Sequence, residues 1–347
     1  MRVPIMKSPQ IATSRMTPET WKTNPCEGTI VWSPSKSLWI SFHFLVSILF
    51  APIHFSLPAV LSAFALTVLT LCLGHTVGLH RLLIHRSFSC PKALERFLVY
   101  MGTLVGMGGP FRMIYMHDIR DWAQRHPVCH PFYIHSNPLW KDGVWQLHMD
   151  LCLHHPPRFM VEEGTSQDGF YRFLQKTWML QQVLPALVLF YFGGLPFVVW
   201  GTSVRIVVSL VGHWMVGYFA HNSGGCSWHM VGHAVQGYNL PHLGLLTMGE
   251  CWHNNQHAFP GSAKLGHQPG QVDPGWWLIL GLNKLGLAWD IRLPSSFTYS
   301  PGRVPLSRDA QWDRNQWLLN PATGHQPMNG PEPAENCKRE PGITRPS

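Results

Sequence analysis

The sequence contains few charged residues, and acidic residues are the scarcest of them. Charged side chains make up 13% of the 347 residues, about half of the ~25% usual in soluble domains. Only 18 residues are Asp or Glu, fewer than the 21 histidines. The eight cysteines include no CxxC pair, which argues against cysteine-held zinc or iron–sulfur clusters. The net charge of +8 is not gathered into a basic stripe among aromatic residues, so we expect no nucleic-acid partner.

Four long apolar runs indicate an integral membrane protein. Residues 57–78 carry no charge and are long enough to cross about 30 Å of hydrocarbon. Residues 38–55, 183–200 and 202–220 form the other runs. The predicted fold is therefore an all-α membrane protein with four transmembrane helices in two hairpins, a multi-pass arrangement in which the lipid bilayer is a partner.

The remaining segments are expected to form a polar N-terminal arm, a cap and a tail. The arm comprises residues 1–37, the integral-membrane domain residues 38–294, and the Pro- and Gly-rich tail residues 295–347, which we expect to be disordered. A helix that lies on or dips into the membrane is expected at residues 93–107, an interfacial helix at residues 275–287, and further cytoplasmic helices at residues 112–125 and 142–153.

Lysine and arginine residues predict the orientation. All of them except Arg205 lie before the first run, between the second and third, or after the fourth. The positive-inside rule then places both termini and the cap in the cytoplasm. Arg205, near the start of the fourth run, is expected to snorkel to the interface.

Histidines stand where the second and fourth runs end. His80 and His85 follow the second run, and His221 closes the fourth. His253 and His257 are four apart, which places both on one helix face. The topology brings these ends to one cytoplasmic face, so a metal site is expected there. His80 and His85 are five apart, about 140° on an ideal helix; they would bind neighbouring metals, or one metal if the helix ends between them.

A third pair, His117 and Asp121, is also four apart. A carboxylate is a hard ligand suited to iron or manganese, so we predict both as ligands. The alternative is a surface ion-pair network of Asp121 with Arg120 and Arg125. Further candidates, as extra ligands or as neighbours of ligands, are His130, His154, His155 and His213.

Two motifs resemble those of the membrane fatty acyl desaturases, the histidine-box family. Residues 78–88 (GLHRLLIHRSF) are similar to the first box, HxxxxH, and residues 249–263 to the third. The resemblance covers roughly residues 35–295. It implies four membrane helices, a cytoplasmic cap and a di-iron centre whose ligands would be His80, His85, His117, His221, His253 and His257. The similarity to bacterial members implies a bacterial inner membrane.

The chain differs from the family pattern at three positions. Arg120 stands where the second box, HxxHH, has its middle histidine, and a guanidinium has no lone pair to donate. Gln256 takes the same place in the third box and is a candidate weak ligand. Gly217 replaces an asparagine four residues before His221.

The resemblance implies an oxidoreductase that uses O2 to introduce a cis double bond into a fatty acyl chain, carried on CoA or on a lipid. The chain has neither a CxxC pair nor the HPGG run of cytochrome b5. An external electron donor, ferredoxin-like or cytochrome b5-like, is therefore implied. Two alternatives remain open: a hydroxylase or ketolase on the same scaffold, and a non-catalytic membrane relative with a degraded metal site.

Overall fold

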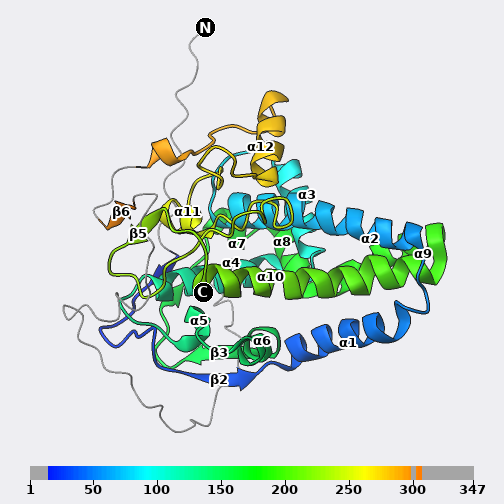
Figure 1. Cartoon of the computed structure of the whole chain (residues 1–347), viewed down its shortest axis with the longest axis horizontal. Coiled ribbons are helices and arrows are strands. Elements are labelled where there is room, and N and C mark those ends of the chain that lie inside the picture. Colours follow the sequence, from blue (N-terminus) through cyan, green and yellow to red (C-terminus); the bar gives the residue numbers. More distant parts are fainter. Residues whose placement is uncertain (1–14, 298–301, 307–347) are drawn as a thin grey trace.

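Long helices gather at one end of the molecule, and short helices, strands and loops cap the other end (Figure 1). The computed structural model describes residues 15–297 and 302–306. Helix α1 (Pro34–Phe50) leads through a short connection to α2 (Leu57–Leu69), which continues directly into the π-helix η1 (Thr70–Ile84). Ser56 caps α2 by accepting a hydrogen bond from the backbone N–H of Ala59. The first two predicted runs thus form two helices, and both pack against the later segment 199–204.

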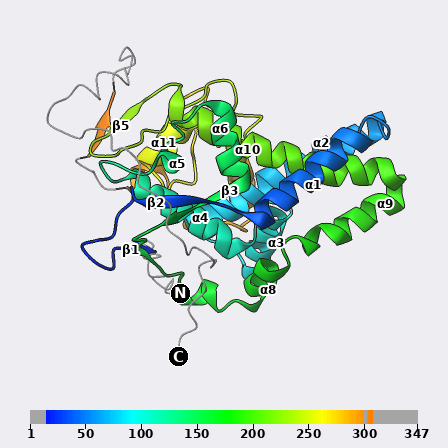
Figure 2. The same cartoon turned by 90° about the horizontal axis from the view of Figure 1, so that it is seen from below.

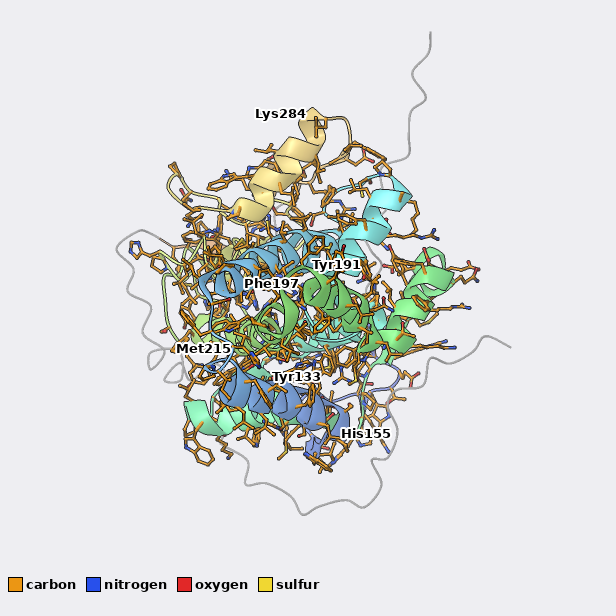
Figure 3. All side chains as sticks on the ribbon, turned by 90° about the vertical axis from the view of Figure 1, so that its right-hand side faces the viewer. Tyr133, His155, Tyr191, Phe197, Met215 and Lys284 are labelled. Atoms are coloured by element: carbon orange, nitrogen blue, oxygen red, sulfur yellow. The ribbon has the colours of Figure 1, made fainter. Side chains whose placement is uncertain are left out.

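The third and fourth predicted runs fold back on each other at Gly194. Helix α9 (Val183–Val198), the π-helix η3 (Val199–Val204) and α10 (Arg205–Asn222) follow one another without a loop. Within α9, Gly194 has φ 63° and ψ −156°, a conformation essentially restricted to glycine. A Cβ on Gly201 would lie 2.8 Å from the side chain of Leu189, so the two arms pack side by side. Figure 3 shows Tyr191 and Phe197 on neighbouring ribbons at this end.

The expected turn between residues 200 and 202 is therefore wrong. The reason is that Gly193 and Gly194 allow the chain to turn without any polar residue. The turn therefore lies inside the apolar run predicted at residues 183–200. The expectation for Arg205 fails with it, because Arg205 lies 11 residues beyond the turn and is buried. Its guanidinium donates hydrogen bonds to the carbonyls of Gly201 and Leu104 and to Oε1 of Gln182.

The long helices present apolar side chains outward. Two helical runs, Leu57–Ile84 and Leu180–Asn222, are long and apolar enough to cross a membrane. Viewed from below, α1, α2 and α9 extend away from the cap together (Figure 2). Such a continuous apolar surface is far larger than soluble proteins expose. The large apolar side chains exposed on these helices include Leu38, Phe42, Leu45, Ile48, Leu57, Leu61, Phe64, Leu184, Leu187, Tyr191 and Phe192.

Helices and two-stranded sheets build the cap. Its helices are α3 (Lys92–Thr103), α4 (Pro110–Gln124), α5 (Pro131–Ile134), α6 (Leu139–His148), α7 (Glu163–Ser166), α8 (Gly169–Thr177), α11 (His253–Ala258) and α12 (Pro274–Lys284), with 3-10 turns η2 (Leu180–Gln182) and η4 (Pro294–Ser296). Among the described residues, three antiparallel pairs form: β1 (Met16–Thr17) with β4 (Arg158–Phe159), β2 (Gly28–Trp32) with β3 (Met149–Leu153), and β5 (Trp228–Met230) with β6 (Arg303–Pro305).

The strands bear on three of the predicted segments. Of the N-terminal arm, residues 16–17 and 28–32 form β1 and β2, which pair with later segments. The helix predicted at residues 142–153 ends at His148, where the β-branched Thr-Ile-Val run of β2 recruits residues 149–153 as a strand. Of the tail, Arg303–Pro305 form β6, and residues 298–301 and 307–347 lie outside the described residues.

Glycines let η1 and α3 approach closely. A Cβ on Gly78 would lie 2.4 Å from the carbonyl oxygen of Leu98, and one on Gly74 would lie 2.3 Å from the backbone of Met101. The core beside this crossing contains Leu79, Leu83 and Val99. The position of η1, and hence of His80 and His85, therefore depends on backbone contact with α3.

We predict that Gly78→Ala destabilises the protein, because the new methyl group meets backbone rather than a flexible side chain. The expected cost is about 1–3 kcal/mol, as for other overpacked sites. Thermal unfolding of the purified protein in detergent tests this. Gly281→Ala in α12 is the matched control, since nothing lies within 4 Å of its added Cβ. Equal melting temperatures for both variants would contradict the prediction.

His130 predicts a pH dependence of stability. Its Nδ1 caps α5 by accepting a hydrogen bond from the N–H of Phe132. Burial, followed by the nearby charge of His154, lowers the pKa of His130 to about 4, against ~6.5 when unfolded. The unfolded chain therefore binds more protons, and the free energy of unfolding falls as the pH decreases from about 6.5 to about 4, by on the order of 2–3 kcal/mol.

Thermal scans at pH 7 and pH 4.5 measure this loss. His130→Asn keeps a capping oxygen but does not titrate, so its melting temperature should fall less on acidification. An identical fall in the variant would exclude His130 as the source.

Candidate metal centre

The first cluster of imidazoles, which we call the first triad, contains His80, His85 and His117. The π-helical register of η1 explains how the first two meet. The N–H of His85 donates to the carbonyl of His80, five residues earlier, and this wider turn aligns residues that are five apart. Their Nε2 atoms lie 3.1 Å apart. Of the two arrangements left open by the spacing, the structure therefore brings both histidines to one site.

His117 joins this triad from α4. Its ring centroid lies 4.6 Å from that of His85 and 5.4 Å from that of His80. The candidate ligand atoms of the three side chains all lie within 4.8 Å of one another. The triad thus combines the end of η1 with a helix of the cap.

The second triad contains His221, His253 and His257. His221 stands at the end of α10, and the other two are one turn apart on α11. The Nε2 atom of His253 lies 3.2 Å from that of His221 and 3.1 Å from that of His257. The expected meeting of the fourth run with the His253/His257 pair is therefore found in the structure.

Acceptors behind the rings determine which nitrogen carries the proton. Nδ1 of His80 lies 2.7 Å from Glu250 Oε2, Nδ1 of His117 lies 3.0 Å from Asp118 Oδ1, and Nδ1 of His221 donates to the carbonyl of Gly217 at 2.7 Å. A carboxylate or a carbonyl oxygen only accepts, so the proton belongs on Nδ1. The Nε2 lone pairs then face the interior of each triad, as metal ligation requires.

The electrostatics of the cap favour neutral imidazoles. Burial, followed by the neighbouring histidines, lowers the pKa of His85 and of His253 well below the ordinary value. Burial also lowers the pKa of His257 to about 4. Neutral imidazole is the form that binds a metal. His85, His253 and His257 therefore offer neutral rings at neutral pH, and the grouping of three imidazoles in each triad fits a metal ion.

Glu250 is a functional residue that the sequence analysis missed. Its side chain is 16% exposed, accepts a hydrogen bond from Thr76 Oγ1 at 2.8 Å and lies behind His80. Burial alone would raise the pKa of Glu250, but His80 and Arg81 more than offset it, so the pKa lies well below its usual range. The available signal was an acidic residue three positions before His253 in a chain poor in acids.

The two predicted oxygen ligands lie beside the triads rather than in them. Nε2 of the Gln256 amide lies 3.1 Å from Nε2 of His85, so Gln256 borders the first triad. Asp121 is paired with Arg125 at 2.6 Å, as the ion-pair alternative expected. The negative charge of Asp121 nonetheless acts on His257, where it opposes the lowering of the pKa by burial. Asp121 therefore lies near the second triad and stays a candidate ligand.

Arg120 points away from ligation and toward His135. One guanidinium nitrogen lies 2.6 Å from His135 Nε2, and another donates to Gln146 Oε1 at 2.8 Å. His135 is in turn paired with Asp142 at 2.9 Å, and its ring stacks on His221 with centroids 5.3 Å apart. A Cβ on Gly217 would lie 3.7 Å from this ring. The glycine thus leaves room for the histidine that Arg120 engages.

The other candidates do not join either triad. His130 caps α5, and His154, which contacts Thr29 Oγ1, is exposed like His155. His213 packs against His75 inside the bundle, with ring centroids 4.8 Å apart. Gln124 was not predicted, yet its Nε2 lies 3.1 Å from His221 Nε2.

No protein-family model matches the chain, but curated relatives do. The sn-1 stearoyl-lipid 9-desaturase of Synechocystis sp. is 38% identical over 73% of this chain and 78% of its own length. A protein of the same name from Anabaena variabilis is 36% identical over 74% of this chain and 92% of its own. The acyl-CoA C20 Delta5-desaturase of Anemone leveillei is 32% identical over 78% and 90%. With such identities over most of each chain, and with two histidine triads in the predicted boxes, the protein belongs to the membrane fatty acyl desaturase family and is a fatty acyl desaturase.

Proposed function

We propose that the protein is an O2-dependent desaturase that holds one iron ion in each triad and introduces a cis double bond into a fatty acyl chain. The observation that carries this proposal is the pair of histidine triads whose Nε2 atoms converge while acceptors occupy Nδ1 of three rings. Six imidazoles then supply the core of the ligand set. Asp121 and Gln256 are the nearby groups that would complete it.

The reaction to be catalysed consumes O2 and two electrons. The balance is R–CH2–CH2–R′ + O2 + 2 e⁻ + 2 H⁺ → R–CH=CH–R′ + 2 H2O. When bound, the two ions would supply the oxidising power that no side chain has. The chain's own residues have other tasks: the imidazoles hold the ions, and Glu250 and Asp118 fix His80 and His117. The bundle supplies an apolar environment in which one C–C bond can be placed.

The two electrons require an external donor, ferredoxin-like or cytochrome b5-like. This proposal rests on the sequence, which has neither a CxxC pair nor an HPGG run. A donor would have to approach the cap, because the triads lie between η1, α4, α10 and α11 at that end of the molecule.

We further propose that α1, α2 with η1, and the two arms that meet at Gly194 all cross the membrane, with both termini and the cap in the cytoplasm of a bacterium. Their exposed apolar side chains support the spanning arrangement. The orientation is supported by the lysines and arginines. All of them except Arg205 lie before the first apolar run, between the second and third, or after the fourth.

An acyl group attached to a lipid is the first substrate to test. Two of the relatives described above are named stearoyl-lipid 9-desaturases. An acyl-CoA substrate is the second, because the Anemone leveillei relative is named for it.

Lipid analysis of a bacterial host expressing the chain tests the reaction. We expect new monounsaturated acyl chains, detected by gas chromatography and mass spectrometry, and none with His257→Ala, which removes one ligand of the second triad. His155→Ala, an exposed histidine outside both triads, is the matched control and should retain the product. Hydroxylated acyl chains instead would favour a hydroxylase.

Metal analysis tests the centre itself. After loading with Fe(II), the purified protein should hold about two iron ions per chain, one for each triad. His253→Ala should lose about one of them and all turnover. Iron-free wild-type protein, or full turnover by His253→Ala, would contradict the proposed centre.

A further inference from the structure

Arg15, in the arm that precedes α1, reaches the rear of the first triad. Only 4% of its side chain is exposed. The residue lies directly before β1, and its carbonyl accepts a hydrogen bond from the N–H of Met160 beside the β1–β4 pair. The backbone is therefore anchored independently of the guanidinium. The side chain is free to perform a separate task at the interface between η1 and α4.

The guanidinium holds the end of the helix that carries His85. Nη1 donates to the carbonyl of Ile84 at 3.0 Å, and Nη2 lies 3.4 Å from the carbonyl of Leu83. The last carbonyls of a helix lack partners within it. Arg15 supplies donors to two of them immediately before His85, and so fixes the backbone from which this ligand projects.

The same guanidinium holds the carboxylate that orients His117. Nη1 also donates to Asp118 Oδ2 at 3.0 Å, while Asp118 Oδ1 accepts from Nδ1 of His117 at 3.0 Å. On its outer side, Nε of Arg15 donates to Glu162 at 2.8 Å. Arg15 therefore connects His85, through the backbone, with His117, through Asp118. Only the planar, five-donor guanidinium can reach all of these acceptors at once; an ammonium group cannot.

We propose that Arg15 is a positioning residue that sets the metal affinity of the first triad by holding His85 and His117 in register. Arg15 acts on His117 through Asp118, which hydrogen-bonds to both side chains. The proposal rests on the metal centre proposed above and adds that a residue of the N-terminal arm determines how well one half of that centre binds. Without Arg15, Asp118 loses its buried cationic partner and the η1 terminus loses two hydrogen bonds, so two of three ligands are released from their orientation.

Binding of Co(II) to the metal-free, full-length protein in detergent tests this. The unsubstituted chain should bind about two equivalents. In Arg15→Gln, one of the two sites should weaken about tenfold or more, the range seen when partners behind metal ligands are removed, while the other keeps its affinity. Arg15→Lys should weaken the same site less, because it keeps the charge but not the fork.

Arg96→Gln is the matched control. Arg96 is also a cap arginine that pairs with a carboxylate, Asp168, but it touches neither triad. Its variant should bind two equivalents with unchanged affinity, even if it melts earlier. A general loss of stability would affect both variants and both sites, whereas a positioning role affects one site of one variant.

Asp118→Asn completes the test. Arg15 acts on His117 through Asp118, so the two substitutions should not have independent effects. The loss of Co(II) affinity in the double variant Arg15→Gln/Asp118→Asn should be clearly smaller than the product of the two single losses. Two unchanged sites in Arg15→Gln, or multiplicative effects in the double variant, would overturn the inference while leaving the metal centre intact. Failure of the unsubstituted chain to bind metal would overturn the proposed centre and this inference with it.

Discussion

Imidazole nitrogens that face one another across about 3 Å must be held there, because lone pairs without a shared cation or proton repel. The structure meets this constraint from behind each ring. Glu250 lies 2.7 Å from Nδ1 of His80, and Asp118 and the carbonyl of Gly217 accept hydrogen bonds from Nδ1 of His117 and His221. Burial keeps the remaining rings uncharged by lowering the pKa of His85, His253 and His257. The acceptors behind the rings and the neutral state of the buried imidazoles therefore hold together rings that would otherwise repel one another. The result is two sites suited to a cation.

The candidate ligands could be predicted from the sequence, but not the groups that orient them. Spacing placed His253 and His257 on one face, and the apolar runs brought His221 to the same end. The π-helix that aligns His80 with His85 could not be predicted, because residues five apart do not share a face of the α-helix that the apolar run predicts. Glu250 and Arg15 escaped notice because each approaches its histidine from a distant segment. The turn at Gly194 was marked by the preceding glycine and Pro196, a signal that the apolar composition obscured.

Two of the three departures from the family pattern, Arg120 and Gly217, meet at the same side chain. Arg120 engages His135, whose ring lies beside Gly217 and stacks on His221. Gln256 lies beside His85 in the first triad. The substitution of a histidine by an arginine is therefore accompanied by a local polar network that ends at Asp142, so the cationic side chain is bonded away from the ligand atoms rather than left among them.

The lengths of the long helical arms have a consequence for the acyl chain. The runs Leu57–Ile84 and 195–222 each contain 28 residues, whereas about 20 helical residues cross the ~30 Å of hydrocarbon in a bilayer. In the membrane arrangement proposed above, the additional residues place His80 and His221 at the cap-side ends of these runs, outside the hydrocarbon. A fatty tail cannot meet the triads while it remains among its neighbours in the leaflet. The tail has to leave the surrounding lipids, and apolar side chains of the protein must then enclose it between the leaflet and the triads.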